Sequence, residues 1–256
     1  MAWRVQHFQD VASTNDEARA RALAGDPGKI WFVAERQSAG RGRLDRRWVS
    51  PRGNLHASAL LIEPCAAEKA AEIGFVAGVA LIDALRGIQA AVPLPHKAGG
   101  NSAREFRLKW PNDVLAGPAK LAGILVEGLT LPNRKFAAIV GIGVNCQTAP
   151  EGVAYPTTHL SAELGREIEP IDVFAALKSR FADAIGLWRA RSGFAAIRAA
   201  WLDRAAGLGE TIGVRRGGVI HHGVFAGLDP IGRLQLKSAD GALSLIEAGD
   251  VALARI

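Results

Sequence analysis

The sequence predicts a mixed α+β fold, in which a mainly antiparallel sheet with helices is followed by a small β-barrel. Short apolar runs rich in β-branched residues alternate with tight turns, and hairpins are more evident than strand–helix–strand units. From about residue 210 the pattern changes to short strands divided by glycine-rich turns, which is typical of a small barrel. We therefore expect a main domain over residues 1–207 and a small domain over 208–256.

Length and composition indicate a soluble globular protein. The 256 residues, 49% of them hydrophobic, are enough for a large domain with a small companion. No apolar run approaches the roughly 20 residues of a membrane helix, and the N-terminus lacks a signal-peptide pattern, so we expect a cytoplasmic protein with no membrane partner. Cys65 and Cys146 have neither disulfide nor zinc-site spacing. The net charge of +6 favours an acidic partner or a polyphosphate ligand.

The individual elements follow from caps, apolar runs and breakers. Thr14 and Glu17 have the spacing of a capping box, and Gly25 can end the helix that follows. A second helix is rich in alanine, leucine and valine, and Gly87 is expected to stop it. In chain order the sequence predicts a helix over 15–24, strands over 30–34 and 55–62, a helix over 66–85, a long irregular loop over 88–104, strands over 108–115, 121–126 and 136–144, and helices over 171–191 and 194–204.

The most informative segment is the arginine loop, residues 40–48, which joins two predicted strands. It carries four arginines and two glycines. Glycine lets the backbone approach a ligand closely, and arginine offers a charged fork that matches phosphate or carboxylate oxygens. Alone, the loop fits an anion site, and it fits a solvated basic surface or a nucleic-acid patch at least as well.

Three further segments bear on the choice. Residues 109–114 place a lysine, an amide and a carboxylate around a proline-stiffened turn. Residues 120–127 begin an apolar strand with a lysine, and residues 141–145 end a strand on glycines and an amide. Each pattern alone is equally an ordinary turn, strand edge or strand end.

Together and in this order, the four segments closely resemble the biotin protein ligase family, whose signatures are GRGR..R.W, KWPND, KLAGIL.E and G.G.N. Ser13, Thr14, Asn15 and Gln37 also stand where that family keeps its biotin contacts. The resemblance covers essentially the whole chain. It implies a class II synthetase-like catalytic domain and a C-terminal SH3-like domain.

The resemblance implies a two-step ligase. Biotin and ATP, with Mg²⁺, would form biotinyl-5′-adenylate and pyrophosphate, and a lysine of a biotin carboxyl carrier protein, of acetyl-CoA carboxylase or a similar enzyme, would then take the biotin. It implies no tightly bound cofactor, a monomer or a homodimer, and an arginine loop that orders as a lid when ligand arrives.

The implied site residues are carried over position by position. The catalytic residues would be Lys120, Arg43 and Asp113, with Asp113 also a magnesium ligand. Biotin contacts would come from Ser13, Thr14, Asn15, Gln37, Arg41, Gly42, Arg43, Lys120 and Gly123. ATP contacts would come from Arg41, Arg43, Arg46, Trp48, Lys109, Asn112, Asp113, Lys120 and Asn145.

Two other function classes remain open from the sequence. A lipoate–protein ligase shares the fold and the acyl-adenylate chemistry, and a basic nucleic-acid-binding protein would share the arginines. Because the catalytic signatures begin by Ser13, we expect no DNA-binding domain before them and no specific DNA binding. Dinucleotide and P-loop motifs fail on spacing. The adjacent His221 and His222 point to opposite faces of a strand, which disfavours a shared metal ion.

Overall fold

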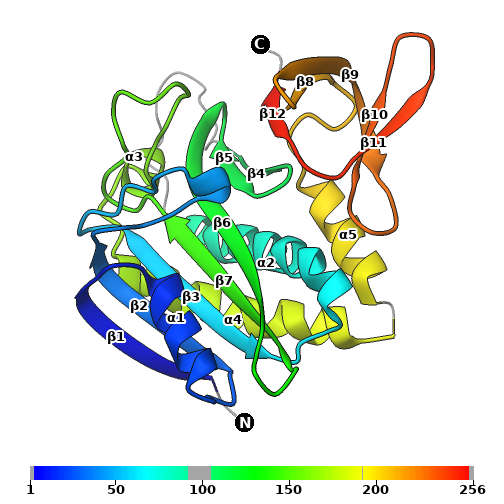
Figure 1. Cartoon of the computed structure of the whole chain (residues 1–256). Helices are drawn as coiled ribbons and strands as arrows, with labels where there is room; N and C mark the ends of the chain where they lie inside the picture. The colour runs from blue at the N-terminus through cyan, green and yellow to red at the C-terminus, as the bar shows by residue number, and fades with distance from the viewer. Residues whose placement is uncertain (1–2, 92–104, 192, 254–256) are drawn as a thin grey trace.

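Two sheets organise the computed structural model, which describes residues 3–91, 105–191 and 193–253 (Figure 1). The larger sheet has seven strands in the order β1-β2-β3-β7-β6-β5-β4. Strands β1 and β2 pair in parallel and are connected by a helix. The other neighbouring pairs in this sheet are antiparallel. Its strands are β1 (Arg4–Val11), β2 (Ile30–Gln37), β3 (Leu55–Ile62), β4 (Phe106–Lys109), β5 (Asp113–Ala116), β6 (Ala119–Thr130) and β7 (Phe136–Val144).

Helices cover both faces of this sheet. In Figure 1, α2 and α4 lie behind it and α1 lies in front. The helices are α1 (Thr14–Leu23), α2 (Ala70–Ala90), α3 (Leu160–Leu164), α4 (Pro170–Arg189) and α5 (Gly193–Asp203), with short 3₁₀ turns at Arg43–Asp45 and Ala67–Lys69. Within the described ranges, no helix is long and apolar enough to cross a membrane.

The packing of the core explains why strands such as β3 are apolar at most positions and not only at alternate ones. Residues with odd numbers on β3, such as Leu55 and Leu61, join the large cluster beneath α2 and α4, whereas Leu60 packs against α1 through Ala18 and Ala22. A strand buried on both faces needs apolar side chains on both faces. At its centre the α1 face departs from this rule, because His56 and Ser58 are buried there.

The C-terminal strands form a separate five-stranded antiparallel sheet. Its order is β11-β10-β9-β8-β12, so β11 and β12 are unpaired edges in the described residues. The predicted SH3-like character fits this sheet, but the prediction of a closed barrel is wrong for the part of the chain described. The strands are β8 (Thr211–Arg216), β9 (Val219–Leu228), β10 (Leu234–Lys237), β11 (Leu243–Ile246) and β12 (Asp250–Leu253).

The small sheet is packed against the main body through specific contacts. The Trp110 indole donates a hydrogen bond to the Gly232 carbonyl oxygen at 3.2 Å. A side chain at Gly232 would overlap Phe75 of α2, so the turn between β9 and β10 must lie directly on that ring. These contacts bring β12 beside β4 and above the first sheet, where the candidate site lies (Figure 1).

The predicted α+β class is confirmed, and several predicted element bounds are corrected. Residues 108–115 are two strands, β4 and β5, because the turn at 110–112 folds the chain back on itself. Helix α2 runs through Gly87 to Ala90, so residues 88–90 are helical. β1 and the short α3 were not predicted. The rest of the predicted loop over 88–104 lies, beyond Ala91, outside the described residues.

Candidate active site

The site is built on one straight row of residues across the large sheet. Partners in neighbouring strands share a face, so a row of partners places consecutive side chains side by side on the surface. The row crosses five neighbouring pairs of strands, from β2 to β4, on the face that α1 covers. Its members are Ala34, His56, Gly143, Gly123, Asp113 and Lys109.

Glycines in the middle of this row let an aromatic ring lie on the backbone. A Cβ built on Gly143 would overlap the Trp48 indole, and a Cβ on Gly123 would lie 3.1 Å from Trp48 Cζ3. Gly141, two residues earlier on β7, is covered in the same way by the Asn15 side chain. The glycine-rich strand end therefore accommodates two of the protein's own site residues, Trp48 and Asn15.

A buried cluster of hydroxyls and amides closes one end of the row. Gln37 Oε1 accepts hydrogen bonds from the Thr14 backbone nitrogen at 2.8 Å and from Thr14 Oγ1 at 3.0 Å. Ser58 Oγ lies 2.7 Å from Thr14 Oγ1 and 2.6 Å from Asn15 Oδ1. The predicted capping role of Thr14 is wrong: Ser13 occupies the N-cap position, and Thr14 Oγ1 bonds to Gln37. These hydrogen bonds fix the side chains relative to one another.

Arg41 belongs to this polar end through a pair of carboxylates. Its guanidinium donates to both oxygens of Asp16, at 2.8 and 2.6 Å, and lies 3.8 Å from Glu127. The hydrogen bond from Arg41 holds the pKa of Asp16 below its ordinary value, although burial opposes this shift. Glu127 in turn accepts from Asn15 Nδ2 at 2.6 Å. Arg41 thus fastens the arginine loop to the start of α1.

The tip of the arginine loop has a strained backbone. Leu44 and Asp45 have φ values of 56° and 55°, in the left-handed region that side chains other than glycine seldom adopt. This turn directs Arg43 and Arg46 toward the other end of the row. Arg43 Nη1 donates to Asn112 Oδ1 at 3.2 Å, and burial lowers the pKa of Arg43. Strain of this kind persists only where surrounding contacts hold the loop.

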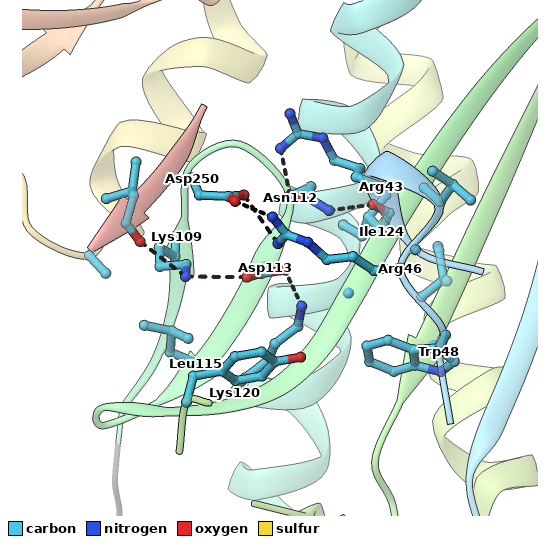
Figure 2. Close-up of a pocket in the computed structure, with 18 of the residues that line it drawn as sticks. Arg43, Arg46, Trp48, Lys109, Asn112, Asp113, Leu115, Lys120, Ile124 and Asp250 are labelled. Atoms are coloured by element: carbon cyan, nitrogen blue, oxygen red, sulfur yellow. Dashed lines mark hydrogen bonds and ion pairs between the residues drawn. The ribbon is translucent and has the colours of Figure 1, made fainter. Parts of the chain in front are cut away.

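Arg46 connects the arginine loop to the small sheet. It forms an ion pair with Asp250, the first residue of β12, and its Nη1 lies 3.3 Å from Asp250 Oδ1 (Figure 2). The hydrogen bond from Arg46 lowers the pKa of Asp250. A carboxylate from the C-terminal sheet therefore completes this end of the site.

Asp113 lies between two lysines at the opposite end of the row from Gln37. Lys120 Nζ is 2.7 Å from Asp113 Oδ1, and Lys109 Nζ is 3.3 Å from Oδ2 (Figure 2). Lys109 also donates to the Val251 carbonyl oxygen at 3.3 Å. Both oxygens of Asp113 are thus engaged by ammonium groups. A carboxylate in that position is a poor ligand for a magnesium ion, contrary to what the sequence led us to expect.

The cavity that these groups line has a volume of about 1380 Å³. This exceeds the roughly 300–1,000 Å³ of a typical small-molecule pocket, so the space can hold two substrates at once. The cavity extends from the polar cluster at Thr14 to β12. Of the predicted site residues, it is lined by Ser13, Thr14, Asn15, Gln37, Arg41, Gly42, Arg43, Arg46, Trp48, Lys109, Asn112, Asp113, Lys120 and Gly123.

Asn145 is the predicted site residue that lies apart from this cavity. It is buried, and its amide Nδ2 donates to the Thr158 carbonyl oxygen at 3.0 Å. It lines a much smaller adjoining cavity of about 30 Å³, together with Trp48, Lys120 and Tyr155. His221 and His222 are exposed residues of β9, and no group of three possible metal ligands occurs in the described ranges.

Sequence reasoning missed four residues of this site. His56 and Ser58 are buried polar residues in an apolar strand, and that contrast was a readable signal. Tyr155 and Asp250 lie in a loop and at a strand start far along the chain, and only the tertiary fold brings them to the cavity.

The chain is similar to known proteins along nearly its whole length. Residues 7–145 match the biotin/lipoate A/B protein ligase family, and residues 207–253 match the biotin protein ligase C terminal domain. The chain is 40% identical to biotin--[acetyl-CoA-carboxylase] ligase of Paracoccus denitrificans, across 93% of this chain and 96% of that protein. It is 32% identical to the protein of the same name from Mycobacterium tuberculosis, across 97% and 89%.

A solved structure with bound ligands has the same fold. Biotin protein ligase from Aquifex aeolicus in complex with biotin and ATP matches with a TM-score of 0.79 and 26% sequence identity, and the match covers 99% of each chain.

Proposed function

The chain belongs to the biotin/lipoate A/B protein ligase family and is an ATP-dependent biotin protein ligase, and we propose that its cavity forms and then consumes biotinyl-5′-adenylate. In the first step a biotin carboxylate oxygen attacks the α-phosphorus of ATP, and the bond to pyrophosphate breaks. In the second, a lysine amine of a biotin carboxyl carrier protein attacks the acyl carbon, AMP leaves, and the amine loses a proton.

The observation that carries this proposal is the polarity of the row across the sheet. Neutral hydroxyls and amides gather at one end, where they match the donors and acceptors of biotin's ureido ring. Cationic groups gather at the other end, where they match phosphate oxygens. Between the two ends, glycines let the Trp48 ring lie on the strands, and this ring would form the apolar wall along which the valeryl chain lies.

We assign the roles accordingly. Ser13, Thr14, Asn15, Gln37, Gly42 and Gly123 would hold biotin. Lys120 and Arg43 would stand at the reacting carboxylate and α-phosphate, because two anions must approach there and fixed cations stabilise the charge that builds up. Arg46, Lys109, Asn112 and Trp48 would contact ATP, with Asn145 at the adenine.

Two predicted roles are revised in this proposal. Arg41 is held by Asp16 and Glu127 at the biotin end, so we assign it to biotin and not to ATP. Asp113 would fix the positions of Lys109 and Lys120 by forming an ion pair with each of them, and we do not assign it to a magnesium ion. The carrier protein as acceptor, the cytoplasmic location, the absence of specific DNA binding and the domain boundary at residue 207 remain predictions.

The arginine pairing disfavours the nucleic-acid alternative. Arg41, Arg43 and Arg46 each have a partner within the site and do not form an open basic surface. A gel shift at low and high salt tests this, since binding through phosphates alone would be strongly salt-dependent and unaffected by biotin.

The experiment that separates biotin from lipoate is ATP–pyrophosphate exchange with the purified protein. Biotin should support exchange and lipoate should not. A streptavidin blot after addition of a carrier domain then tests the second step. Exchange with lipoate alone would overturn the assignment of substrate.

A further inference from the structure

Lys120 lies between two aromatic rings. Its Nζ is 5.5 Å from the ring centroid of Trp48 and 5.5 Å from that of Tyr155, within the range of a cation–π interaction. Its third partner is the Asp113 carboxylate at 2.7 Å. The side chain is 17% exposed and is thus largely enclosed.

The Tyr155 ring is brought there by a loop fixed to Lys120 itself. We call residues 147–159 the tyrosine loop; it follows β7. The Lys120 backbone nitrogen donates to the Pro156 carbonyl oxygen at 2.8 Å, and the Thr158 nitrogen donates to the Lys120 carbonyl oxygen at 3.0 Å. Tyr155 is therefore adjacent in sequence to a residue that is hydrogen-bonded directly to Lys120.

Side-chain bonds hold the rest of the loop in this position. Thr157 Oγ1 donates to the Pro150 carbonyl oxygen at 2.7 Å, and Thr158 Oγ1 donates to Glu163 at 2.6 Å. The Asn145 amide donates to the Thr158 carbonyl oxygen. These anchors restrict the path of the loop, although Tyr155 itself is 46% exposed. An exposed ring held over a lysine by its neighbours' backbone is not explained by packing of the core.

We propose that Tyr155 is a positioning residue for the ligase reaction, which acts by holding the Lys120 ammonium against Asp113 and Trp48 where the biotin carboxylate meets ATP. Aromatic faces attract an ammonium group but accept no strong hydrogen bond from it. The rings therefore do not compete for the N–H donors that Asp113 leaves free, and these donors are available to substrate oxygens in the cavity that Lys120 lines. This inference rests on the proposed role of Lys120.

The test compares Tyr155→Leu with Tyr155→Phe in biotin-dependent ATP–pyrophosphate exchange. Phenylalanine keeps the aromatic face, so its maximal rate should stay within about twofold of the wild type. Leucine removes the face, and the rate should fall about fivefold, the effect of losing one partly exposed cation–π contact. The KM for biotin should change less than about twofold in both variants, because the ureido contacts lie at the far end of the row.

A second measurement separates positioning from a general effect on the loop. In a Lys120→Ala background, adding Tyr155→Leu should leave the rate of single-turnover adenylate formation unchanged, since the group being held is gone. Glu151→Ala serves as the matched control, because Glu151 is exposed in the same loop and lines neither of the two cavities. It should leave exchange unchanged.

Each outcome has a distinct meaning. An inactive wild type would refute the proposed ligase function. An active wild type with an equally active Tyr155→Leu variant would overturn the inference alone. The inference alone would also be overturned if Tyr155→Phe were as slow as Tyr155→Leu. It would equally be overturned if Tyr155→Leu slowed the Lys120→Ala protein by a further fivefold or so.

Discussion

Lys120 combines an ion pair of 2.7 Å with a position on the wall of both cavities. Replacing it with alanine removes the compact positive charge from the point where two anions react. We expect Lys120→Ala to lower the rate of adenylate formation by about 100-fold or more, the range seen when one preorganised charge-stabilising group is lost. Single-turnover assays with labelled biotin measure this directly.

The Lys120→Ala variant needs a control for folding. Lys135→Ala is suitable, because Lys135 pairs with Glu63 on the surface, away from the cavity. It should form adenylate at the wild-type rate. Near-normal adenylate synthesis by Lys120→Ala would remove Lys120 from its assigned role.

His56 gives a prediction about pH. Its Nε2 lies 3.0 Å from the Pro51 carbonyl oxygen and must therefore donate, which leaves Nδ1 unprotonated and, among the described residues, without a partner. Burial lowers the pKa of His56 below its ordinary value of 6.5. As pH falls below 6.5, the unfolded chain takes up a proton first, so this residue makes the free energy of unfolding decrease with falling pH.

Replacing His56 with glutamine should remove that decrease while keeping a donor near Pro51. We expect the free energy of unfolding of His56→Gln to fall less than that of the wild type between about pH 7.5 and about pH 5. Urea titrations at the two pH values measure the difference. Equal losses in both proteins would mean that His56 titrates normally in the folded state.

For single residues, the sequence was most informative about polar side chains in strongly patterned segments. Lys120, Asp113 and Gln37 could be selected because they stand at positions that resemble those of the biotin protein ligase family. His56 and Asp250 could not be assigned a role in this way, since the contrast of a histidine with an apolar strand does not say what the histidine does, and an aspartate at a strand start is common. Their importance depends on which residues the fold places opposite them.

The arginine loop is the element on which retention of the intermediate should depend. Arg43 reaches from the strained tip to Asn112 and closes one side of the cavity. In Arg43→Gly that contact is lost and the backbone becomes freer, so biotinyl-adenylate should escape before transfer. The measurement is biotin on bystander proteins after incubation with ATP and biotin, which should increase several-fold.

Leu44→Gly separates loop flexibility from loss of the guanidinium. Leu44 is 73% exposed and has a left-handed φ of 56°, so glycine relieves strain there and leaves Arg43 in place. This variant should label bystanders no more than the wild type does. If it leaks as much as Arg43→Gly, flexibility alone is responsible.

Elements with regular patterns were predicted well, and those defined by tertiary contacts were not. The strands at 55–62 and 136–144 and the helices near 171–191 and 194–204 agree with β3, β7, α4 and α5 within a few residues. β1 was missed because it is a half-exposed edge strand with polar residues throughout. Gly87 did not end α2, because it does not adopt the positive φ of a helix-ending glycine and the helix continues to Ala90.

The two sheets are joined at the active site by the pair of Arg46 and Asp250. The side chains are 57% and 39% exposed, so the pair should add little to global stability. Its effect should instead be on the loop: in Asp250→Asn, Arg46 is less firmly held, and the KM for ATP should rise about two- to fivefold.

Salt provides the check on this prediction. Raising ionic strength weakens exposed ion pairs, so wild-type KM for ATP should rise toward that of Asp250→Asn, whose own KM should change less. Asp240→Asn is a control on the same sheet but distant from Arg46, and it should behave as wild type. A KM for ATP that is unchanged in Asp250→Asn would show that the small sheet does not act through this pair.

For the molecule as a whole, the order of motifs predicted which segments meet, but not how. The expected class and the small second sheet were correct. The closed barrel was not, because closure depends on pairing between β11 and β12, which short glycine-divided strands do not encode.

The row from Ala34 to Lys109 has a consequence for how refolding can be followed. Side chains alternate between faces along a strand, so a pairing error of one residue at β3 or β7 would turn His56 or the glycines toward α2 and remove them from the row. A chain with such a slipped strand could be compact and rich in β-structure, yet it would form no adenylate. The fraction of activity recovered after denaturation therefore counts molecules with correctly aligned strands, which circular dichroism alone cannot distinguish.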